Sequence, residues 1–367
     1  MSEWPMFHHD RAHTGTSLSS APNSLKLKWK FSTNASVCSS PAVAKGKVFI
    51  MSYDGYLYCL DSVTGTSTWK KHLKSPGAFY GGGASSPAVD KLVYVGGRDG
   101  NVYCLSPIDG KMIWKFPMGA QVGPSIPGGM GIAIDCSDSS PTVAGDKVYI
   151  GSGDHNVYCL DWEGGKPIWK FPTGAGINSS PAVVDGKVYI GSYDRMLYCL
   201  DAESGNFIWK FLTGPGLFLT PGGVSCAPAV DRRRVYFGAE DGVVYCLDVI
   251  SGKLIWKFPT GWYISSSPAV VDGKVYIGSG DGNVYCLGAK SGEQIWKFST
   301  GWGVCSSPAV ADSKVYIGSV DKNFYCLDAE RGKLMWSYVA GPVVSSPAVA
   351  NGRVYVASNW CDVFCFV

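Results

Sequence analysis

The chain has 367 residues, of which 46% are hydrophobic and 17% charged, and 32 basic against 29 acidic residues give a net charge of +3. This composition is typical of a globular protein, and the dispersed charges without a basic run argue against nucleic-acid binding. No apolar stretch is long enough for a membrane span, and the first residues do not resemble a signal peptide. Thirteen cysteines without a CxxC or adjacent pair predict a reduced, cytoplasmic protein.

The first predicted element is a lead-in segment, residues 1–24. It contains four residues of metal-ligating type at close spacing: His8, His9, Asp10 and His13. One cluster lacks the two-part spacing of established zinc motifs, so we predict no metal site. We expect Trp4 and Phe7 to pack this segment onto the rest of the protein.

From residue 25 onward the sequence repeats, and each unit carries a proline marker and a tryptophan marker. The prolines are Pro41, Pro87, Pro141, Pro181, Pro228, Pro268, Pro308 and Pro347, and the tryptophans are Trp29, Trp69, Trp114, Trp169, Trp209, Trp256, Trp296 and Trp336. The commonest step is 40 residues, which suits a four-stranded propeller blade. Residues 25–367 are therefore predicted to form one all-β, eight-bladed β-propeller of antiparallel blades.

Within a unit, short runs rich in β-branched and aromatic residues alternate with turns such as Asp185-Gly186. The middle runs are almost continuously apolar, as expected for strands that neighbouring blades cover on both faces. Lysine follows the tryptophan marker in seven of eight units, which marks the fourth strand as the outer edge. Because Trp29 precedes the first proline marker, the N-terminal strand is predicted to complete the last blade and close the ring.

Residues 200–205 (Leu-Asp-Ala-Glu-Ser-Gly), which lead to Trp209, resemble the tryptophan-docking repeat of the PQQ-like (quinoprotein-type) propellers. Further matches to this family are residues 287–292 before Trp296, residues 327–332 before Trp336, and residues 4–7 with Asp10 and Thr14 in the lead-in. The resemblance implies the propeller fold. It leaves the activity open, since the family includes dehydrogenases, assembly-factor scaffolds of the BamB type and kinase sensor domains.

The PQQ-dependent dehydrogenases of this family typically add a disulfide between adjacent cysteines above the quinone, and a calcium site. This sequence has no adjacent cysteines, and no Glu/Asn/Asp set in it matches the calcium ligands. Calcium takes about six to eight oxygen ligands, which the short loops barely supply. We predict that the protein binds neither PQQ nor calcium, nor any other cofactor.

The lengths of the connections locate a candidate binding face. Proline-to-tryptophan spacings are 28 residues six times and 27 once, whereas the tryptophan-to-proline spacings are 12, 18, 27, 12, 19, 12, 12 and 11. All insertions therefore lie between one blade's fourth strand and the next blade's first strand, on one face of the ring. The inserted residues 75–83, 118–138 and 212–225 are apolar and rich in glycine and proline, as in binding surfaces.

We predict that this face carries an aromatic, largely neutral pocket. The expected ligand-binding residues are Phe79, Tyr80, Arg98, Phe218, Trp262, Tyr263 and Trp302. The alternative is that the inserted loops fold down and plug the central channel. Candidate acid–base residues on the same face are Asp135, Asp138, His155 and Glu240, where His155 replaces the usual turn glycine.

Cysteine recurs at one position of the third strand, where it is interpreted as a small core residue. Four other cysteines lie near the start of inner strands or in an insertion and are weaker candidates for a nucleophile: Cys38, Cys136, Cys226 and Cys305.

The leading interpretation is a monomeric, non-catalytic binding or scaffold propeller that presents its pocket to a peptide, a protein or a small hydrophobic ligand. The alternative is an enzyme of isomerase, cyclase or lyase type that acts on a neutral apolar substrate. A PQQ-dependent oxidoreductase ranks behind both.

Overall fold

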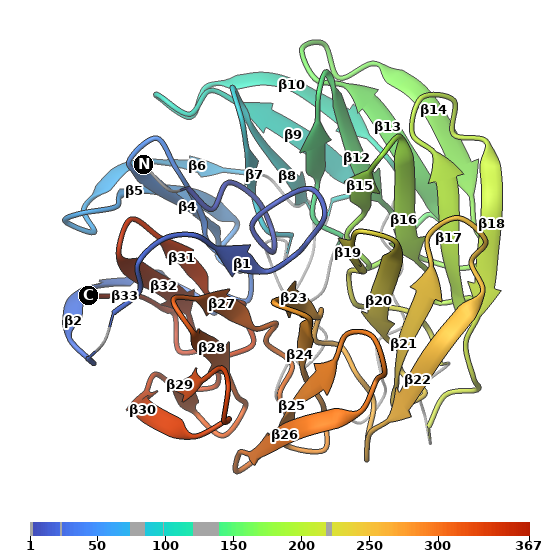
Figure 1. The fold of residues 1–367 in the computed structure, drawn as a ribbon. Coiled ribbons are helices and arrows are strands. Elements are labelled where there is room, and N and C mark those ends of the chain that lie inside the picture. The colour runs from blue at the N-terminus through green and yellow to red at the C-terminus, as the bar shows by residue number, and fades with distance from the viewer. Residues whose placement is uncertain (1–2, 23, 74–84, 98, 120–138, 218–221) are drawn as a thin grey trace.

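The computed structural model describes residues 3–22, 24–73, 85–97, 99–119, 139–217 and 222–367. These residues form eight four-stranded antiparallel units arranged in a ring, which confirms the predicted all-β, eight-bladed propeller (Figure 1). The described residues contain no helix, and therefore none long and apolar enough to cross a bilayer.

The strands of each blade follow one another from the channel to the outer edge. The first four blades comprise β3 (Ala42–Ala44), β4 (Lys47–Met51), β5 (Tyr56–Asp61) and β6 (Ser67–His72); β7 (Ala88–Val89), β8 (Val93–Gly97), β9 (Asn101–Leu105) and β10 (Met112–Pro117); β11 (Thr142–Ala144), β12 (Lys147–Gly151), β13 (Asn156–Asp161) and β14 (Pro167–Pro172); and β15 (Ala182–Val184), β16 (Lys187–Gly191), β17 (Met196–Asp201) and β18 (Phe207–Leu212).

The last four blades comprise β19 (Ala229–Asp231), β20 (Arg234–Gly238), β21 (Val243–Asp248) and β22 (Leu254–Pro259); β23 (Ala269–Val271), β24 (Lys274–Gly278), β25 (Asn283–Gly288) and β26 (Gln294–Ser299); β27 (Ala309–Ala311), β28 (Lys314–Gly318), β29 (Asn323–Asp328) and β30 (Leu334–Val339); and β31 (Ala348–Ala350), β32 (Arg353–Ala357), β33 (Asp362–Phe366) and β2 (Leu27–Ser32).

The N-terminal strand closes the ring as predicted. β2 pairs antiparallel with β33, although about 330 residues separate them, and Trp29 lies opposite Cys365. The eighth blade therefore takes its outer strand from the start of the chain.

The tryptophan markers join neighbouring blades. The indole N–H of Trp169, for example, donates to the Ala202 carbonyl of the next blade at 3.0 Å, and the ring covers Gly205. Gly205 has a φ of +70°, and a Cβ there would lie 2.6 Å from the Trp169 ring. Seven of the eight markers dock in this way. The eighth, Trp336, has no hydrogen-bond partner among the described residues and contacts Phe366 instead.

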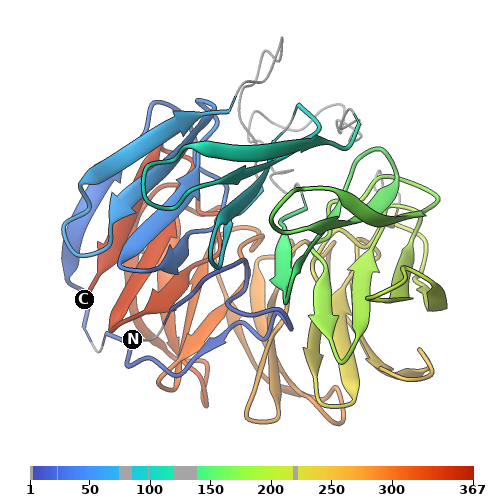
Figure 2. The same ribbon diagram turned by 90° about the horizontal axis from the view of Figure 1, so that it is seen from above.

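The lead-in segment lies across one end of the ring (Figures 1 and 2). Its carbonyl groups accept hydrogen bonds of 2.7–2.9 Å from one repeated valine amide in six blades. The donors are Val43, Val89, Val183, Val230, Val270 and Val310, and the acceptors are Trp4, Pro5, Arg11, Ala12, Thr14 and Gly15. A short strand, β1 (Thr16–Ser17), then pairs with β27. We call this end the N-terminal face.

The opposite end, the insertion face, carries the turns between second and third strands and the links between blades. The two kinds of connection touch there, because the Thr213 amide after β18 donates to the Arg195 carbonyl in the turn after β16. The inner strands thus run from the insertion face to the N-terminal face.

Candidate functional site

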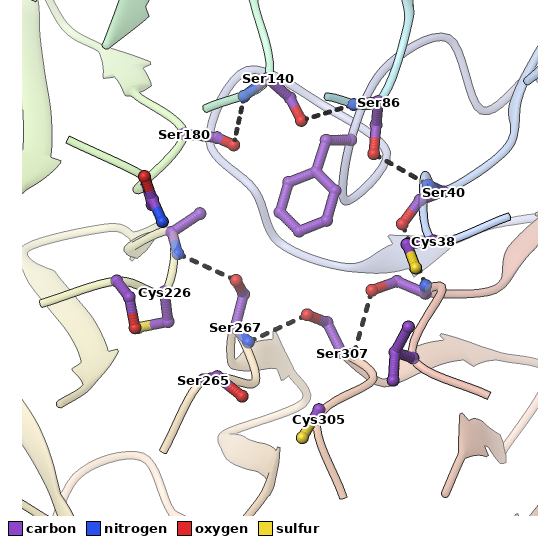
Figure 3. A pocket seen from close by; sticks show the side chains of 16 residues that line it. Cys38, Ser40, Ser86, Ser140, Ser180, Cys226, Ser265, Ser267, Cys305 and Ser307 are labelled. Carbon is purple, nitrogen blue, oxygen red and sulfur yellow. Dashed lines mark hydrogen bonds between the residues drawn. The ribbon is translucent and has the colours of Figure 1, made fainter. Parts of the chain in front are cut away.

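The central channel is lined by a ring of serine hydroxyls at the start of the inner strands (Figure 3). In seven places a backbone amide of one blade donates to a serine Oγ of the next blade, at 2.9–3.0 Å. The acceptors are Ser40, Ser86, Ser140, Ser180, Ser267, Ser307 and Ser346. We call these residues the hydroxyl ring. These hydrogen bonds join every pair of neighbouring blades except the pair formed by the fourth and fifth blades.

The gap in the hydroxyl ring lies in the fifth blade. There Ala227 replaces the ring serine, and Cys226 replaces the serine before it. The Gly238 amide donates to the Cys226 sulfur at 3.2 Å, as the Gly278 amide does to Ser266 in the next blade. Burial raises the pKa of Cys226 to about 12, so this thiol is protonated at neutral pH and is not an activated nucleophile.

Phe7 and two buried histidines of the lead-in segment lie at the N-terminal end of the channel. Phe7 lines the same cavity as the hydroxyl ring, which has a volume of about 70 Å³. His8 Nδ1 is 2.9 Å from the His13 carbonyl oxygen, and His8 Nε2 is 3.0 Å from that of Pro308. Burial lowers the pKa of His8, and burial with the nearby His8 lowers the pKa of His13 to about 3.

Asp10 shows why this histidine-rich segment is a structural element. Burial raises its pKa, but hydrogen bonds from His9 and Thr14 outweigh this and hold the pKa of Asp10 at about 2. Its carboxylate accepts from the Ala12 and Thr14 amides, so it shapes the turn. Among the described residues no group of three His, Cys, Asp or Glu side chains could hold a metal ion.

A groove of about 560 Å³ lies on the insertion face between the links that follow β22 and β26. Three predicted ligand-binding residues line it together: Trp262, Tyr263 and Trp302. The side chains of Trp262 and Trp302 are 39% and 59% exposed. Cys305 lines both this groove and the channel, and its sulfur lies 3.9 Å from the Tyr263 hydroxyl. The groove therefore reaches the mouth of the channel.

Two of the four acid–base candidates lie within the described residues, and they have different surroundings. His155 is exposed in the turn after β12 at a φ of +71°, and it lines neither cavity. Glu240 is 9% exposed, and its carboxylate accepts a 3.2 Å hydrogen bond from the Gly223 amide. The other predicted site residues lie outside the described residues: Phe79, Tyr80, Arg98, Asp135, Asp138 and Phe218.

The repeated third-strand cysteines are core residues, as predicted. All eight are fully buried, and burial raises the pKa of Cys199, for example, to about 12. They are Cys59, Cys104, Cys159, Cys199, Cys246, Cys286, Cys326 and Cys365.

Two features of the sites escaped the sequence interpretation. One is the gap at Ala227, which is visible as the only unit without a serine before its proline. The other is Gly280, whose missing side chain leaves room for Trp262 and Tyr263. Aligning the units position by position would have shown the gap at Ala227 but would not have singled out Gly280, because the third blade has Gly153 at the same position.

The described residues around the channel do not fit a calcium-bound quinone. The described lining consists of hydroxyls, thiols, one amide, Ala227, Val344 and Phe7, with no carboxylate for calcium. A cavity of about 150 Å³ accommodates benzene, and a tricyclic quinone needs more than the 70 Å³ found here. The absence of PQQ and calcium stays a prediction.

Comparisons with known proteins agree with this architecture. The chain is similar in structure to BamB from Moraxella catarrhalis, with a TM-score of 0.73 and 19% identity over 94% of this chain and 97% of the other. Quinohemoprotein alcohol dehydrogenase from Comamonas testosteroni gives a TM-score of 0.81 and 15% identity over 100% of this chain and 80% of the other. The computationally designed Ika8 protein gives 0.73 and 16%, over 95% and 98%. At these identities the likeness shows the fold alone.

The search of curated proteins found no match. A family model described as outer membrane protein assembly factor BamB matches residues 14–211, 98–261, 214–285 and 280–360. Together these matches cover residues 14–360, which include the end of the lead-in segment and all strands from β1 to β32, and they confirm the resemblance to PQQ-repeat propellers. The chain belongs to this BamB-like family of PQQ-repeat propellers.

Proposed function

We propose that this protein is a non-catalytic binding or scaffold propeller, which presents the groove at Trp262, Tyr263 and Trp302 to a peptide, a protein or a small hydrophobic ligand. The observation that carries the proposal is the groove itself, with two exposed tryptophans in adjacent blade links. Its volume is in the usual range for ligand sites, and exposed aromatic residues are enriched where proteins bind partners.

The packing around the groove supports binding by preformed surfaces. The Trp302 carbonyl accepts a hydrogen bond from Ser319 Oγ at 3.1 Å, and the Trp262 carbonyl accepts one from Thr260 Oγ1 at 2.9 Å. The backbones of both links are therefore held in place, and the side chains of Trp262 and Trp302 are partly exposed. Little ordering is needed when a ligand arrives, which favours affinity.

A fluorescence titration with the neutral apolar dye N-phenyl-1-naphthylamine tests the proposal. We expect the dye to brighten on binding, and Trp262→Ala and Trp302→Ala to weaken binding about tenfold each. Trp360→Ala is the matched control, because Trp360 is exposed in the turn after β32 but does not line the groove. Dye binding that ignores both groove substitutions would contradict the proposal.

The second candidate function is an enzyme that uses acid–base chemistry, and the burial of the Glu240 carboxylate beside the channel favours it. Alanine substitutions of Asp135, Asp138, His155 and Glu240 distinguish the two. A binding protein keeps its ligand affinity in these variants, whereas an enzyme loses turnover by orders of magnitude with its fold intact.

We further propose that the protein acts as a cytoplasmic monomer without PQQ, calcium or another cofactor. The twelve cysteines in the described part of the chain are free thiols, which is in keeping with a reducing compartment.

A further inference from the structure

The lining of the groove has an unusual chemical character for an apolar site. Its described side chains include three aromatic rings but only one branched aliphatic group, Val320, and five of the described lining residues are glycines. Among the described residues of this lining, Asp281 is the single charged one, and none is a lysine, an arginine or a histidine. Aromatic faces carry negative electrostatic potential, so the groove is electron-rich without being highly charged.

Gly280 makes the aromatic arrangement possible. A Cβ at this position would lie 2.7 Å from Trp262 Cδ1 and 3.1 Å from Tyr263 Cε1, so both rings rest against bare backbone. Most other blades carry larger residues at the corresponding turn position, including Tyr193 and Glu240, whereas the third blade has Gly153. In the sixth blade, Trp262 and Tyr263 use the space that the missing side chain leaves.

The carboxylate of Asp281 is held in place beneath the Trp262 link. Its Oδ2 accepts from the Gly261 amide at 2.8 Å and from the Tyr285 hydroxyl at 2.7 Å, and its Oδ1 accepts from the Asn283 amide at 2.9 Å. Asp281 is partly exposed, and within the described residues it forms no ion pair. Its negative charge is thus available to a ligand in the groove.

The nearest cation in the neighbouring turn does not compensate this charge. Lys322 follows Asp321 in the turn after β28, and its Nζ lies 5.8 Å from the centre of the Trp360 ring. It belongs to the contact between the seventh and eighth blades. The groove therefore combines aromatic faces with one anionic group.

We infer that the groove binds a small molecule through a quaternary ammonium group. Such a cation is attracted by aromatic faces and by a carboxylate, its methyl groups are apolar, and its dehydration costs less than that of a primary ammonium. The volume of about 560 Å³ suits a small ligand. This inference rests on the proposed binding function and names the ligand class of the same groove.

A pair of probes with the same shape separates charge from hydrophobicity. Choline carries the trimethylammonium group, and 3,3-dimethyl-1-butanol replaces its nitrogen with carbon. Fluorine NMR of protein labelled with 5-fluorotryptophan follows each titration, with the Trp262 and Trp302 signals assigned by their loss on substitution with phenylalanine. We expect choline to shift both signals and to bind about tenfold more tightly than the alcohol.

The outcomes distinguish the inference from the proposed function. Equal binding of the two probes would support an apolar groove and overturn the cation inference alone. Binding of neither probe at the two tryptophans would overturn the cation inference, and the dye titration would then decide the proposed function separately. Choline binding without dye binding would keep the inference and restrict the groove to cations.

Variants of the carboxylate and of Trp302 sharpen the test. Asp281→Asn is expected to weaken choline binding several-fold and to leave the alcohol unchanged. Asp194→Asn is the matched control, since Asp194 accepts from the Gly174 amide at 2.7 Å and the Tyr198 hydroxyl at 2.6 Å but lies outside the groove. Trp302→Phe preserves a ring and should reduce the preference for choline, because tryptophan is the strongest cation–π partner. If the ratio of choline affinity to alcohol affinity were unchanged in both Asp281→Asn and Trp302→Phe, the inference would be refuted.

Discussion

The two faces of the ring use the same repeats in opposite ways. On the N-terminal face, one lead-in segment satisfies a repeated valine amide in six blades, and its Trp4 is 1% exposed. On the insertion face, the links differ in length, and Trp302 is 59% exposed. The N-terminal face therefore contributes to stability in most blades, whereas the links on the insertion face can vary in sequence. Substitutions on the N-terminal face should therefore lower the stability of the protein strongly, and substitutions on the insertion face should lower it only slightly.

The largest effect is expected from Trp4→Ala. Its backbone pairs with Val43, and its ring contacts His9 at 4.9 Å between centroids. Removing a buried tryptophan costs roughly 3–5 kcal/mol, so the free energy of unfolding in urea should fall by about that amount. A loss below about 1 kcal/mol would show that the lead-in segment is dispensable, and the contrast between the faces would fail.

The second largest effect is expected from acid, which should destabilise the N-terminal face. The pKa of His13 is about 3 in the folded protein and near 6.5 when unfolded, and burial also lowers the pKa of His8. The unfolded chain therefore binds more protons below pH 6.5, so stability is fully present above that pH and is lost as the pH falls toward 3. We expect a loss on the order of 2 kcal/mol between pH 7 and 4.5.

Urea unfolding at both pH values measures this loss. His13→Gln removes one titrating group and should reduce the pH dependence. A pH dependence that is the same in both proteins would assign the loss to other groups.

A smaller change is expected from filling the gap in the hydroxyl ring. Ala227→Ser supplies a hydroxyl to the Ser180 amide, while Ser307→Ala removes one from the Ser267 amide. A hydrogen bond contributes about 1 kcal/mol, so the first variant should gain and the second should lose roughly this much stability in thermal unfolding. Destabilisation by Ala227→Ser would mean that the gap is sterically required.

The smallest effect on stability is expected from Trp302→Ala on the insertion face. Its ring is mostly exposed and its link is held by backbone bonds, so the free energy of unfolding should change by less than about 0.5 kcal/mol. Dye and choline binding should nevertheless fall. A stability loss comparable to that of Trp4→Ala would erase the difference between the faces.

The fold could be predicted because the tryptophan markers of the sequence make the contacts between neighbouring blades. Trp169 docks on Gly205 and Ala202 of the next blade, so the spacing of tryptophans counts blades directly. Closure by β2 followed from the same order of markers. Both conclusions depend on local repeats and not on the path of irregular segments.

The sites were only partly predictable because they depend on departures from the repeat. Trp262, Tyr263 and Trp302 were placed on one face by their position in the links, yet the groove also needs Gly280, an ordinary turn residue in the sequence. His155 departs from glycine in the same way as Arg195, with a φ of +71° against +70°, and its side chain is exposed and lines neither cavity. The burial of His8 depends on how the lead-in crosses the ring, which no periodicity describes.

The single gap in the hydroxyl ring has a consequence for motion. Where a serine of the next blade covers an amide, as Ser180 covers that of Ser140, two blades must separate before the proton can exchange. For the Ser180 amide, the equivalent residue of the next blade is Ala227, which has no hydroxyl. Local opening should therefore begin at the joint between the fourth and fifth blades, and deuterium should enter the amide of Ser180 before those of Ser140 and Ser307.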